Sequence, residues 1–115
     1  MMNVPRRRIG RKSKYGNIKT FVDGRLFASK REAARYSELR ILLRAGEIGD
    51  LVCQPRLACP VGSIHVCTYV PDFSYWDHKK NSQVFEDVKG YRTAIYRLKK
   101  KLVLAVHGIE IKEVR

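Results

Sequence analysis

Apolar and polar positions alternate along the chain with two different periods, and these periods predict its first elements. Residues 20–27 place short apolar runs on either side of Asp23-Gly24, a pair that tolerates the positive φ angles of a tight turn, so we expect a β-hairpin. Ser29-Lys-Arg-Glu32 is a capping-box pattern. It predicts a helix that runs to about Ala45 and is stopped by Gly46.

One stripe of this predicted helix combines an acid with apolar residues. Positions 32, 36, 39 and 43 share a face, and the last three are Tyr36, Leu39 and Leu43, which must turn toward a core. Glu32, at the head of the stripe, has two interpretations. Its carboxylate caps the amide of Ser29, or it points inward as part of an active site, and one residue can do both.

The middle of the chain is rich in β-branched and aromatic residues, which favour strands. A strand is predicted from Asp50 to Cys59, interrupted or bent at Pro55. Gln54, a polar residue just before this proline, is either a strand-end hydrogen-bonding group or part of a site. Three segments then follow: a strand over residues 64–76, a polar turn over 77–82 and a strand over 83–89.

The C-terminal part returns to helical spacing. Thr93 is a suitable N-cap, and Gly108 ends the helix. The apolar residues predicted to face inward are Ala94, Leu98, Leu102 and Ala105. Residues 109–114 alternate as a last strand that places Ile109, Ile111 and Glu113 on one side. A helix, three strands, a helix and a strand predict an α/β fold with a mixed sheet flanked by helices.

Charge changes the picture of the N-terminus and of the partner. The 115 residues contain 24 Lys+Arg against 11 Asp+Glu, a net charge of +13, which points to nucleic acid as a polyanionic partner. Residues 1–19 have many basic residues and no acid, so we expect a flexible basic arm ahead of a single domain over residues 20–115. The absence of a membrane span or signal core predicts a soluble, cytoplasmic protein without a membrane partner.

Two strand positions carry the candidate chemistry. Side chains alternate across a strand, so Asp87 and Lys89 share one face, whereas Glu86 lies on the other and is excluded as a ligand. If Asp72 neighbours Asp87 across the strand pair, their two carboxylates repel unless a cation or a proton lies between them. A divalent ion with oxygen ligands, Mg²⁺, is the natural occupant. The alternative is an ordinary surface ion pair between Asp87 and Lys89.

At this point the chain resembles the PD-(D/E)xK nuclease superfamily and, within it, a group of small phage and prophage proteins. The resemblance covers roughly residues 14–114, although the superfamily motif is short. It rests on the runs Phe27-x-Ser29-x-x-Glu32-Ala33, Gln54-Pro55, Pro71-Asp72-Phe73 and Glu86-Asp87-Val88-Lys89-Gly90. Asp at position 87, where Glu is commoner, stays within the pattern, and its shorter reach places a metal nearer the strand.

The resemblance implies a restriction-endonuclease-like αβββαβ core and a Mg²⁺-dependent DNA endonuclease, with Mn²⁺ able to substitute and no small-molecule cofactor. Asp72 and Asp87 would be metal ligands, with the Val88 carbonyl and Glu32 as further ones. Lys89 would orient the attacking water, and Gln54 matches an active-site glutamine of some relatives. It also implies a phage or prophage protein that acts in the cytoplasm of a bacterial cell.

The substrate expected from charge and size is branched DNA, as for a Holliday-junction resolvase that acts in DNA recombination. The chain is too small for a separate sequence-reading domain, and its basic side chains suit phosphate contacts. A resolvase acts on two strands, so a homodimer is expected. The candidate DNA contacts are Arg6, Arg7, Arg8, Arg11, Lys12, Lys14, Arg97, Lys100 and Lys101. The alternative function is a non-catalytic nucleic-acid-binding protein whose acidic residues are structural.

Overall fold

The computed structural model describes residues 19–89 and 92–115. The chain divides into two compact units, one ending at Ser37 and one beginning at Glu38, and each is described by itself. The first unit opens with strands β1 (Thr20–Val22) and β2 (Arg25–Phe27), which pair antiparallel. Asp23 and Gly24 have φ angles of 52° and 76°, so the predicted hairpin and its turn are confirmed.

Helix α2 (Lys30–Arg44) begins and ends as the capping signals predict. The Ser29 hydroxyl accepts a hydrogen bond of 3.1 Å from the Glu32 N–H. At the other end Gly46 has a φ of 78°, and its N–H donates to the Leu43 carbonyl at 3.1 Å. The Glu47 N–H donates to the Leu42 carbonyl at 3.0 Å, and the two bonds together form a Schellman motif. Sequence therefore determines both ends of this helix.

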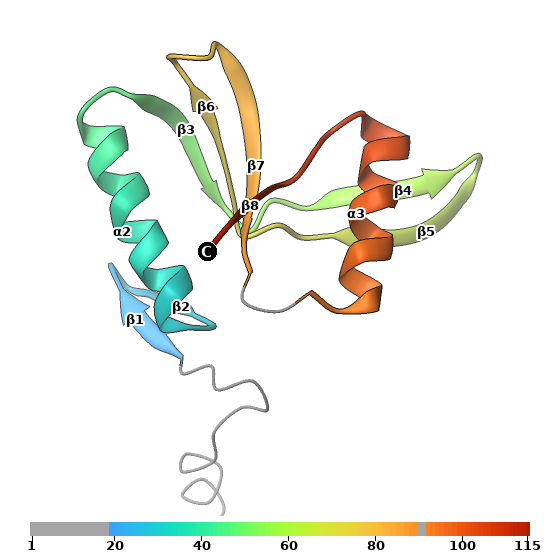
Figure 1. Cartoon of the computed structure of the whole chain (residues 1–115), viewed down its shortest axis with the longest axis horizontal. Helices are drawn as coiled ribbons and strands as arrows, with labels where there is room; N and C mark the ends of the chain where they lie inside the picture. Colours follow the sequence, from blue (N-terminus) through green and yellow to red (C-terminus); the bar gives the residue numbers. More distant parts are fainter. Residues whose placement is uncertain (1–18, 90–91) are drawn as a thin grey trace, which may run out of the picture. The chain divides into compact units, whose positions relative to one another are not determined.

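The second unit is built on a four-stranded mixed sheet (Figure 1). Its strands, in spatial order, are β3 (Ile48–Cys53), β6 (Phe73–Asp77), β7 (Ser82–Val88) and β8 (Lys112–Val114). The first three pair antiparallel, and β8 pairs parallel with β7. The predicted α/β class with a mixed sheet is confirmed.

A separate two-stranded ribbon interrupts this order; it corrects one strand prediction and confirms the predicted interruption at Pro55. Strands β4 (Leu57–Val61) and β5 (Ile64–Tyr69) pair only with each other among the described strands. The run from residue 64 to 76 is therefore two strands in different sheets, not one. The break lies at Val70-Pro71-Asp72, because proline cannot donate the ladder hydrogen bond at that point. Pro55 separates β3 from β4 in the same way.

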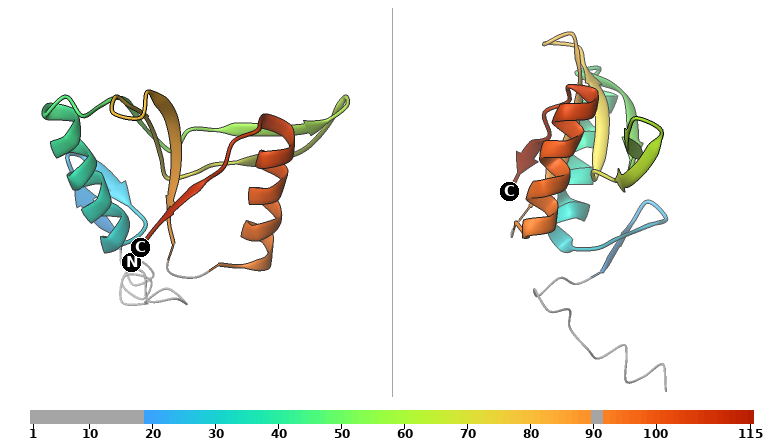
Figure 2. Two further views of the ribbon diagram at one scale, coloured as in Figure 1. Left: turned by 45° about the horizontal axis from the view of Figure 1, so that its top comes forward. Right: turned by 90° about the vertical axis from the view of Figure 1, so that its right-hand side faces the viewer.

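Helix α3 (Ala94–His107) packs against the β4–β5 ribbon (Figure 2). Its predicted ends are confirmed. The Thr93 hydroxyl accepts from the Tyr96 N–H at 3.0 Å, and Gly108 has a φ of 69°. The core beneath the helix consists of Cys59, Tyr69, Tyr96, Val103 and Ile111, with Phe85 of β7 packed against it. This cluster ties the ribbon, the helix and the main sheet together.

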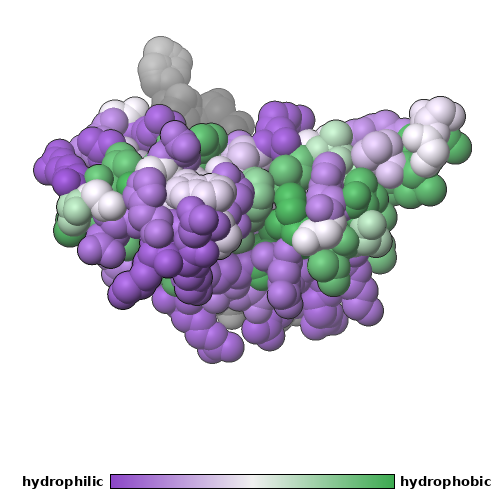
Figure 3. Space-filling view, turned by 90° about the horizontal axis from the view of Figure 1, so that it is seen from above, coloured by the Kyte–Doolittle hydropathy of each residue, from purple (hydrophilic) through white to green (hydrophobic). Residues whose placement is uncertain are grey.

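The predicted inward stripe of α3 was wrong at three of its four positions. Leu98 is 66% exposed, and Ala94 and Ala105 are exposed as well, whereas Tyr96 and Val103 are buried. Leu102, the fourth predicted residue, is partly buried and packs against the core. Figure 3 shows apolar side chains gathered at the surface over the part of the second unit that holds α3 and the ribbon.

The last strand is shorter than predicted. β8 covers Lys112–Val114, and Ile111, just before it, is buried in the core.

Neither of the described helices is long and apolar enough to cross a membrane. The arm predicted over residues 1–19 lies, except for Lys19, outside the described residues. The single-domain organisation stays a prediction.

The corrected helix face makes a stability prediction. Val103→Ala removes two methylenes' worth of buried apolar volume at about 0.8 kcal/mol each and leaves a cavity, so we expect a loss of about 2 kcal/mol. Leu98→Ala, on the exposed stripe, should change the free energy of unfolding by less than about 0.5 kcal/mol. Urea denaturation of both variants checks this. A larger loss for Leu98→Ala than for Val103→Ala would mean that the predicted stripe is the buried one after all.

Candidate functional site

The candidate site lies where β6 begins and β7 ends. Phe73 pairs with Glu86 in the antiparallel register, and continuing that register by one residue places Asp72 opposite Asp87. Two hydrogen bonds join Asp72 to Asp87 and to the next residue, Val88. The Asp72 N–H donates to Asp87 Oδ1 at 3.0 Å, and the Val88 N–H donates to Asp72 Oδ2 at 2.7 Å. The expected neighbourhood of the two carboxylates is therefore confirmed.

Asp87 is a buried carboxylate whose two oxygens have different surroundings. It is 1% exposed, and its Oδ2 has no hydrogen-bond partner among the described residues. Burial raises the pKa of Asp87 above its ordinary value, against the opposing effect of the Lys89 ammonium. A buried anionic oxygen without a donor is costly, so this position favours either a bound cation or a proton.

Lys89 follows the last residue of β7 and stays close to Asp87. Its Nζ lies 4.0 Å from Asp87 Oδ2, and its backbone N–H donates to the Val114 carbonyl at 2.9 Å. The ammonium also lies 4.3 Å from the centroid of the Tyr96 ring. The predicted sharing of one face by Asp87 and Lys89 is confirmed, and the lysine is held between a carboxylate and an aromatic ring.

The opposite face of β7 carries Glu86, as strand parity predicts. Glu86 is fully buried, and its Oε1 accepts a hydrogen bond of 2.8 Å from the Tyr75 hydroxyl. Tyr75 comes from β6 and points to the same side of the sheet, because it pairs with Val84 in the register. The predicted face of Glu86 is therefore confirmed, and its exclusion from the site stays a prediction.

Sequence reasoning missed Glu113, which lies beside Asp87 on the neighbouring parallel strand. Its Oε2 accepts hydrogen bonds from the Tyr96 hydroxyl at 2.8 Å and from Lys100 Nζ at 3.2 Å. Its Oε1 accepts from Arg92 Nε at 2.8 Å. The available signal was its place at the end of the buried side of the last strand. An acid in that position needs partners, and they come from α3 and the segment before it.

These partners stabilise the ionised form of the Glu113 carboxyl group. Hydrogen bonds from Arg92 first, and then from Tyr96 and Lys100, outweigh partial burial and lower the pKa of Glu113 to about 2. Burial, and then the hydrogen bond to Glu113, raise the pKa of the Tyr96 hydroxyl well above its ordinary value. Glu113 therefore stays ionised at neutral pH and keeps Lys100 and Arg92 close to the strand that bears Asp87.

Gln54 approaches the site through its backbone. Its N–H donates to the Asp72 carbonyl at 2.8 Å, and its φ of 54° lies in the left-handed region, which is uncommon for a residue other than glycine. The Gln54 side chain is exposed. The structure thus places Gln54 beside Asp72, while a role for its amide side chain stays a prediction.

Glu32 belongs to the first compact unit. It is 5% exposed and so points inward on α2, as predicted, together with Tyr36 and Leu39. The Ser29 cap bonds to its backbone N–H. Its convergence with Asp72 and Asp87, which belong to the second unit, stays a prediction.

A divalent cation fits the donor set in chemical terms. Asp72 and Asp87 supply carboxylate oxygens, and the Val88 backbone lies between Asp87 and Lys89. Within residues 19–89 and 92–115, no three His, Cys, Asp or Glu side chains come together as a group that could hold a metal. Mg²⁺ commonly keeps several waters and takes only one or two protein carboxylates, so two acids meet its usual need. The unpartnered Asp87 Oδ2 is the observation that supports a cation.

The comparisons with known proteins identify the family. Residues 12–113 match the model of a family described as a protein of unknown function, DUF1064. The chain belongs to the DUF1064 family. No curated protein matches the sequence. The matched range includes every site residue of this DUF1064 protein named above, from Glu32 to Glu113.

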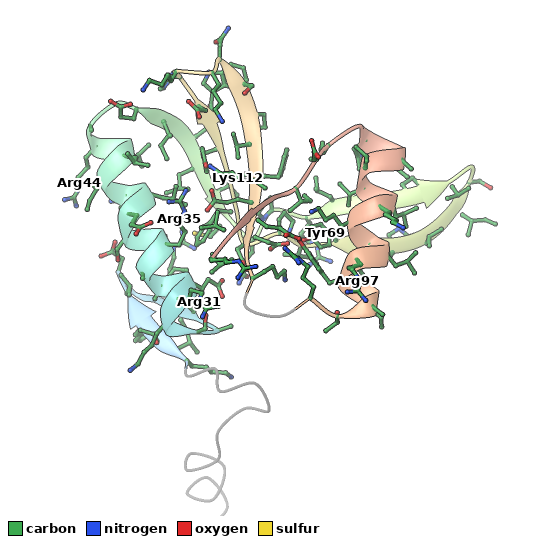
Figure 4. All side chains as sticks on the ribbon, in the orientation of Figure 1. Arg31, Arg35, Arg44, Tyr69, Arg97 and Lys112 are labelled. Carbon is green, nitrogen blue, oxygen red and sulfur yellow. The ribbon has the colours of Figure 1, made fainter. Side chains whose placement is uncertain are left out.

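The predicted DNA-binding residues of this DUF1064 protein differ in their surroundings. Arg97 and Lys101 on α3 are exposed, and Figure 4 labels Arg97. Lys100 is half-buried and paired with Glu113, so its ammonium is turned toward the site. The remaining predicted contacts, Arg6, Arg7, Arg8, Arg11, Lys12 and Lys14, lie outside the described residues.

The depressed pKa of Glu113 predicts an acid-sensitive contribution to stability. A carboxylate whose pKa falls from 4.5 to about 2 on folding stabilises the native state above pH 4.5 and loses that contribution as the pH falls toward 2. Urea denaturation of the wild type and of Glu113→Gln between pH 7 and pH 2 measures it. The wild type should be the more stable protein at pH 7, and the difference should shrink with acidification. A difference that does not depend on pH would contradict the ionised cluster.

Proposed function

We propose that this DUF1064 protein is a Mg²⁺-dependent DNA endonuclease of the PD-(D/E)xK type that hydrolyses phosphodiester bonds. The observation that carries the proposal is the closeness of Asp72 and Asp87, which one hydrogen bond joins directly. The buried Asp87 Oδ2 has no hydrogen-bond donor among the described residues, and Lys89 Nζ lies 4.0 Å from it. Two acids and a lysine in this order, at the ends of two neighbouring strands, have the composition of a phosphodiester-cleaving site.

The order of elements supports the proposal. Helix α2, the antiparallel strands β3, β6 and β7, helix α3 and the parallel strand β8 follow the αβββαβ order that the resemblance implies. The β4–β5 ribbon would then be an insertion between the first and second strands of that core. Fold order alone does not specify a reaction, so the proposal depends on the residues.

Each residue of the site has a separate role in the proposed reaction. Asp72 and Asp87 would hold Mg²⁺, together with the Val88 carbonyl, water, DNA phosphate oxygens and Glu32 directly or through water. Bound Mg²⁺ would supply Lewis-acid stabilisation of phosphoryl oxygens, as would Mn²⁺ in its place. The Lys89 ammonium lies beside Asp87, where it can orient a water or stabilise charge that develops on the phosphoryl group. The Gln54 side chain is proposed to contact the same water or phosphate.

The charge of the chain supports DNA as the substrate. A net charge of +13 attracts a polyanion, and Arg97 and Lys101 are exposed on α3. Phosphate contacts of this kind position a duplex without reading its bases, which favours recognition of DNA shape. We therefore propose branched DNA, such as a four-way junction, as the substrate and a homodimer as the active form.

One observation favours the alternative, a nucleic-acid-binding protein without catalysis. Each of the two carboxylates accepts a backbone N–H from the opposite strand, which is also what a structural carboxylate does. In that case Asp72 and Asp87 only fix the strand ends, and Lys89 neutralises Asp87. Binding without cleavage would then be the whole function.

Cleavage assays separate the two functions. We expect the wild type to cut a labelled four-way junction in Mg²⁺ or Mn²⁺ and to be inactive in EDTA, with weaker cutting of linear duplex and single strand. Asp72→Asn, Asp87→Asn and Lys89→Ala should lower cleavage by at least about 100-fold, because each removes a group placed at the reacting phosphate. DNA binding, measured by gel shift, should change little.

Glu110→Gln is the matched control, since Glu110 is an exposed carboxylate in the segment between α3 and β8. It should cut as the wild type does. Retained cutting by Asp87→Asn would refute the proposed metal site, and a wild type that binds DNA but cuts none would leave the binding protein as the function.

The role of Glu32 has its own test. If its carboxylate takes part in the site, Glu32→Gln should lower cleavage about as strongly as the strand variants while the Ser29 cap, which bonds to the backbone of residue 32, stays formed. Ser29→Ala removes the cap alone and is expected to cost about 1 kcal/mol of stability without loss of cutting. Equal cutting by Glu32→Gln and the wild type, measured in the same assay, would leave Glu32 with a structural role only.

A further inference from the structure

Lys89 has an unusual neighbour in Tyr96. Lysine has a long, flexible side chain, and holding its ammonium at one place costs rotamer entropy. The Lys89 side chain is 28% exposed, and its Nζ lies 4.3 Å from the centroid of the Tyr96 ring and 4.0 Å from Asp87 Oδ2. This geometry is a cation–π contact, in which the ring attracts the ammonium through its negative face. The ammonium is therefore held on two sides.

The Tyr96 ring is itself fixed. Tyr96 is 7% exposed, and its ring packs against the Tyr69 ring with centroids 6.3 Å apart. Its backbone N–H is bonded to the Thr93 cap at 3.0 Å, and its hydroxyl donates to Glu113 Oε2 at 2.8 Å. A ring anchored at its backbone, its face and its tip has little freedom to turn away from Lys89.

Glu113 connects this anchor to the strand of the site. It pairs with Asp87 across the parallel strands β7 and β8, and it accepts hydrogen bonds from Tyr96, Lys100 and Arg92. These donors bond to both Glu113 oxygens, and the Lys89 ammonium lies beside the other carboxylate, with its Nζ 4.0 Å from Asp87 Oδ2. The arrangement separates the cations, with two on Glu113 and one on Asp87.

We infer that Tyr96 is a positioning residue that holds the Lys89 ammonium beside Asp87 for the proposed cleavage reaction, and that Glu113 fixes the ring. The inference rests on the proposed function for its catalytic consequence, but not for its geometry. An aromatic face attracts an ammonium without accepting a directed hydrogen bond from a lone pair. The Lys89 N–H groups thus stay available to a water or a phosphoryl oxygen. A second carboxylate in place of the ring would have accepted hydrogen bonds from these N–H groups.

The geometry is tested without any activity measurement. In the full-length protein labelled with ¹³C-lysine, the ε-methylene protons of Lys89 should resonate upfield of those of the other lysines, because this methylene carries the ammonium that lies over the Tyr96 ring. The Lys89→Arg variant assigns the signal. Tyr96→Phe, which keeps the ring, should keep the upfield shift, and Tyr96→Leu should lose it. An unshifted Lys89 signal in the wild type, or one that Tyr96→Leu does not move, would overturn the inference.

The catalytic consequence is tested by kinetics on the DNA substrate. Tyr96→Leu should lower kcat roughly 3- to 30-fold, the range that a partly desolvated cation–π contact represents, with KM and DNA affinity unchanged. Tyr96→Phe should lose less than Tyr96→Leu, and the difference between Tyr96→Phe and the wild type reports the contact with Glu113. A rise in KM at unchanged kcat, or equal losses for the two variants, would contradict the positioning role.

Tyr69→Phe provides the matched control. The Tyr69 hydroxyl is buried and has no hydrogen-bond partner among the described residues, so Tyr69→Phe takes away a tyrosine oxygen from the same cluster and keeps the ring that packs on Tyr96. It should leave kcat and the Lys89 signal at their wild-type values. If the wild type cuts no DNA while the Lys89 signals behave as stated, the proposed function fails and the contact stands. If the wild type cuts DNA but the signals do not respond, only the positioning role fails.

Discussion

In the second unit, two hydrogen bonds join Asp72 to Asp87 and Val88, where β6 begins and β7 ends. Each carboxylate accepts a backbone N–H from the opposite strand, so the two side chains lock the entry of β6 to the exit of β7. A shift of the register by one residue would break both bonds and turn Glu86 toward the Asp72 face. The residues that form the candidate site are therefore the same residues that set the register of the sheet, which makes site geometry a direct consequence of strand pairing.

Two neighbouring carboxylates of the second unit, Glu113 and Asp87, differ in their contacts with cations. The Asp87 Oδ2 has no hydrogen-bond donor among the described residues. Glu113 has three donors, and its pKa is held at about 2, so Arg92 and Lys100 are committed to it. Asp87 has Lys89 Nζ at 4.0 Å, and burial raises the pKa of Asp87. Two acids that lie side by side on parallel strands thus have opposite electrostatic roles. Both Glu113 oxygens accept hydrogen bonds, whereas the Asp87 Oδ2 accepts none from the described residues and can bind a proton or a metal ion.

The sequence predicted local features well and packing partners poorly. Thr93 and Gly46 were correct because capping depends on neighbouring residues only, and strand parity correctly assigned Asp87, Lys89 and Glu86 to their faces. The pairing of Asp72 with Asp87 was correct because one polar turn connects their strands. The α3 stripe was correct at Leu102 and wrong at its other three positions, because Leu98 and Val103 lie on two different faces of the helix and periodicity does not say which face is covered. Glu113 was missed because its partners Arg92, Tyr96 and Lys100 come from other elements.

The β4–β5 ribbon shows how a segment outside the main sheet can control the candidate site. A two-stranded sheet is only marginally stable alone, so the ribbon needs α3, and α3 needs the ribbon to bury Tyr96 and Val103. Tyr96 and Lys100 are the residues by which α3 reaches Glu113, and the Tyr96 ring is the surface on which the Lys89 ammonium lies. Core packing between Cys59, Tyr69 and Val103 is thereby linked to the position of one ammonium group. A substitution in the ribbon should therefore displace the Lys89 ammonium more than it displaces Asp72 and Asp87, because the main sheet itself holds those two acids.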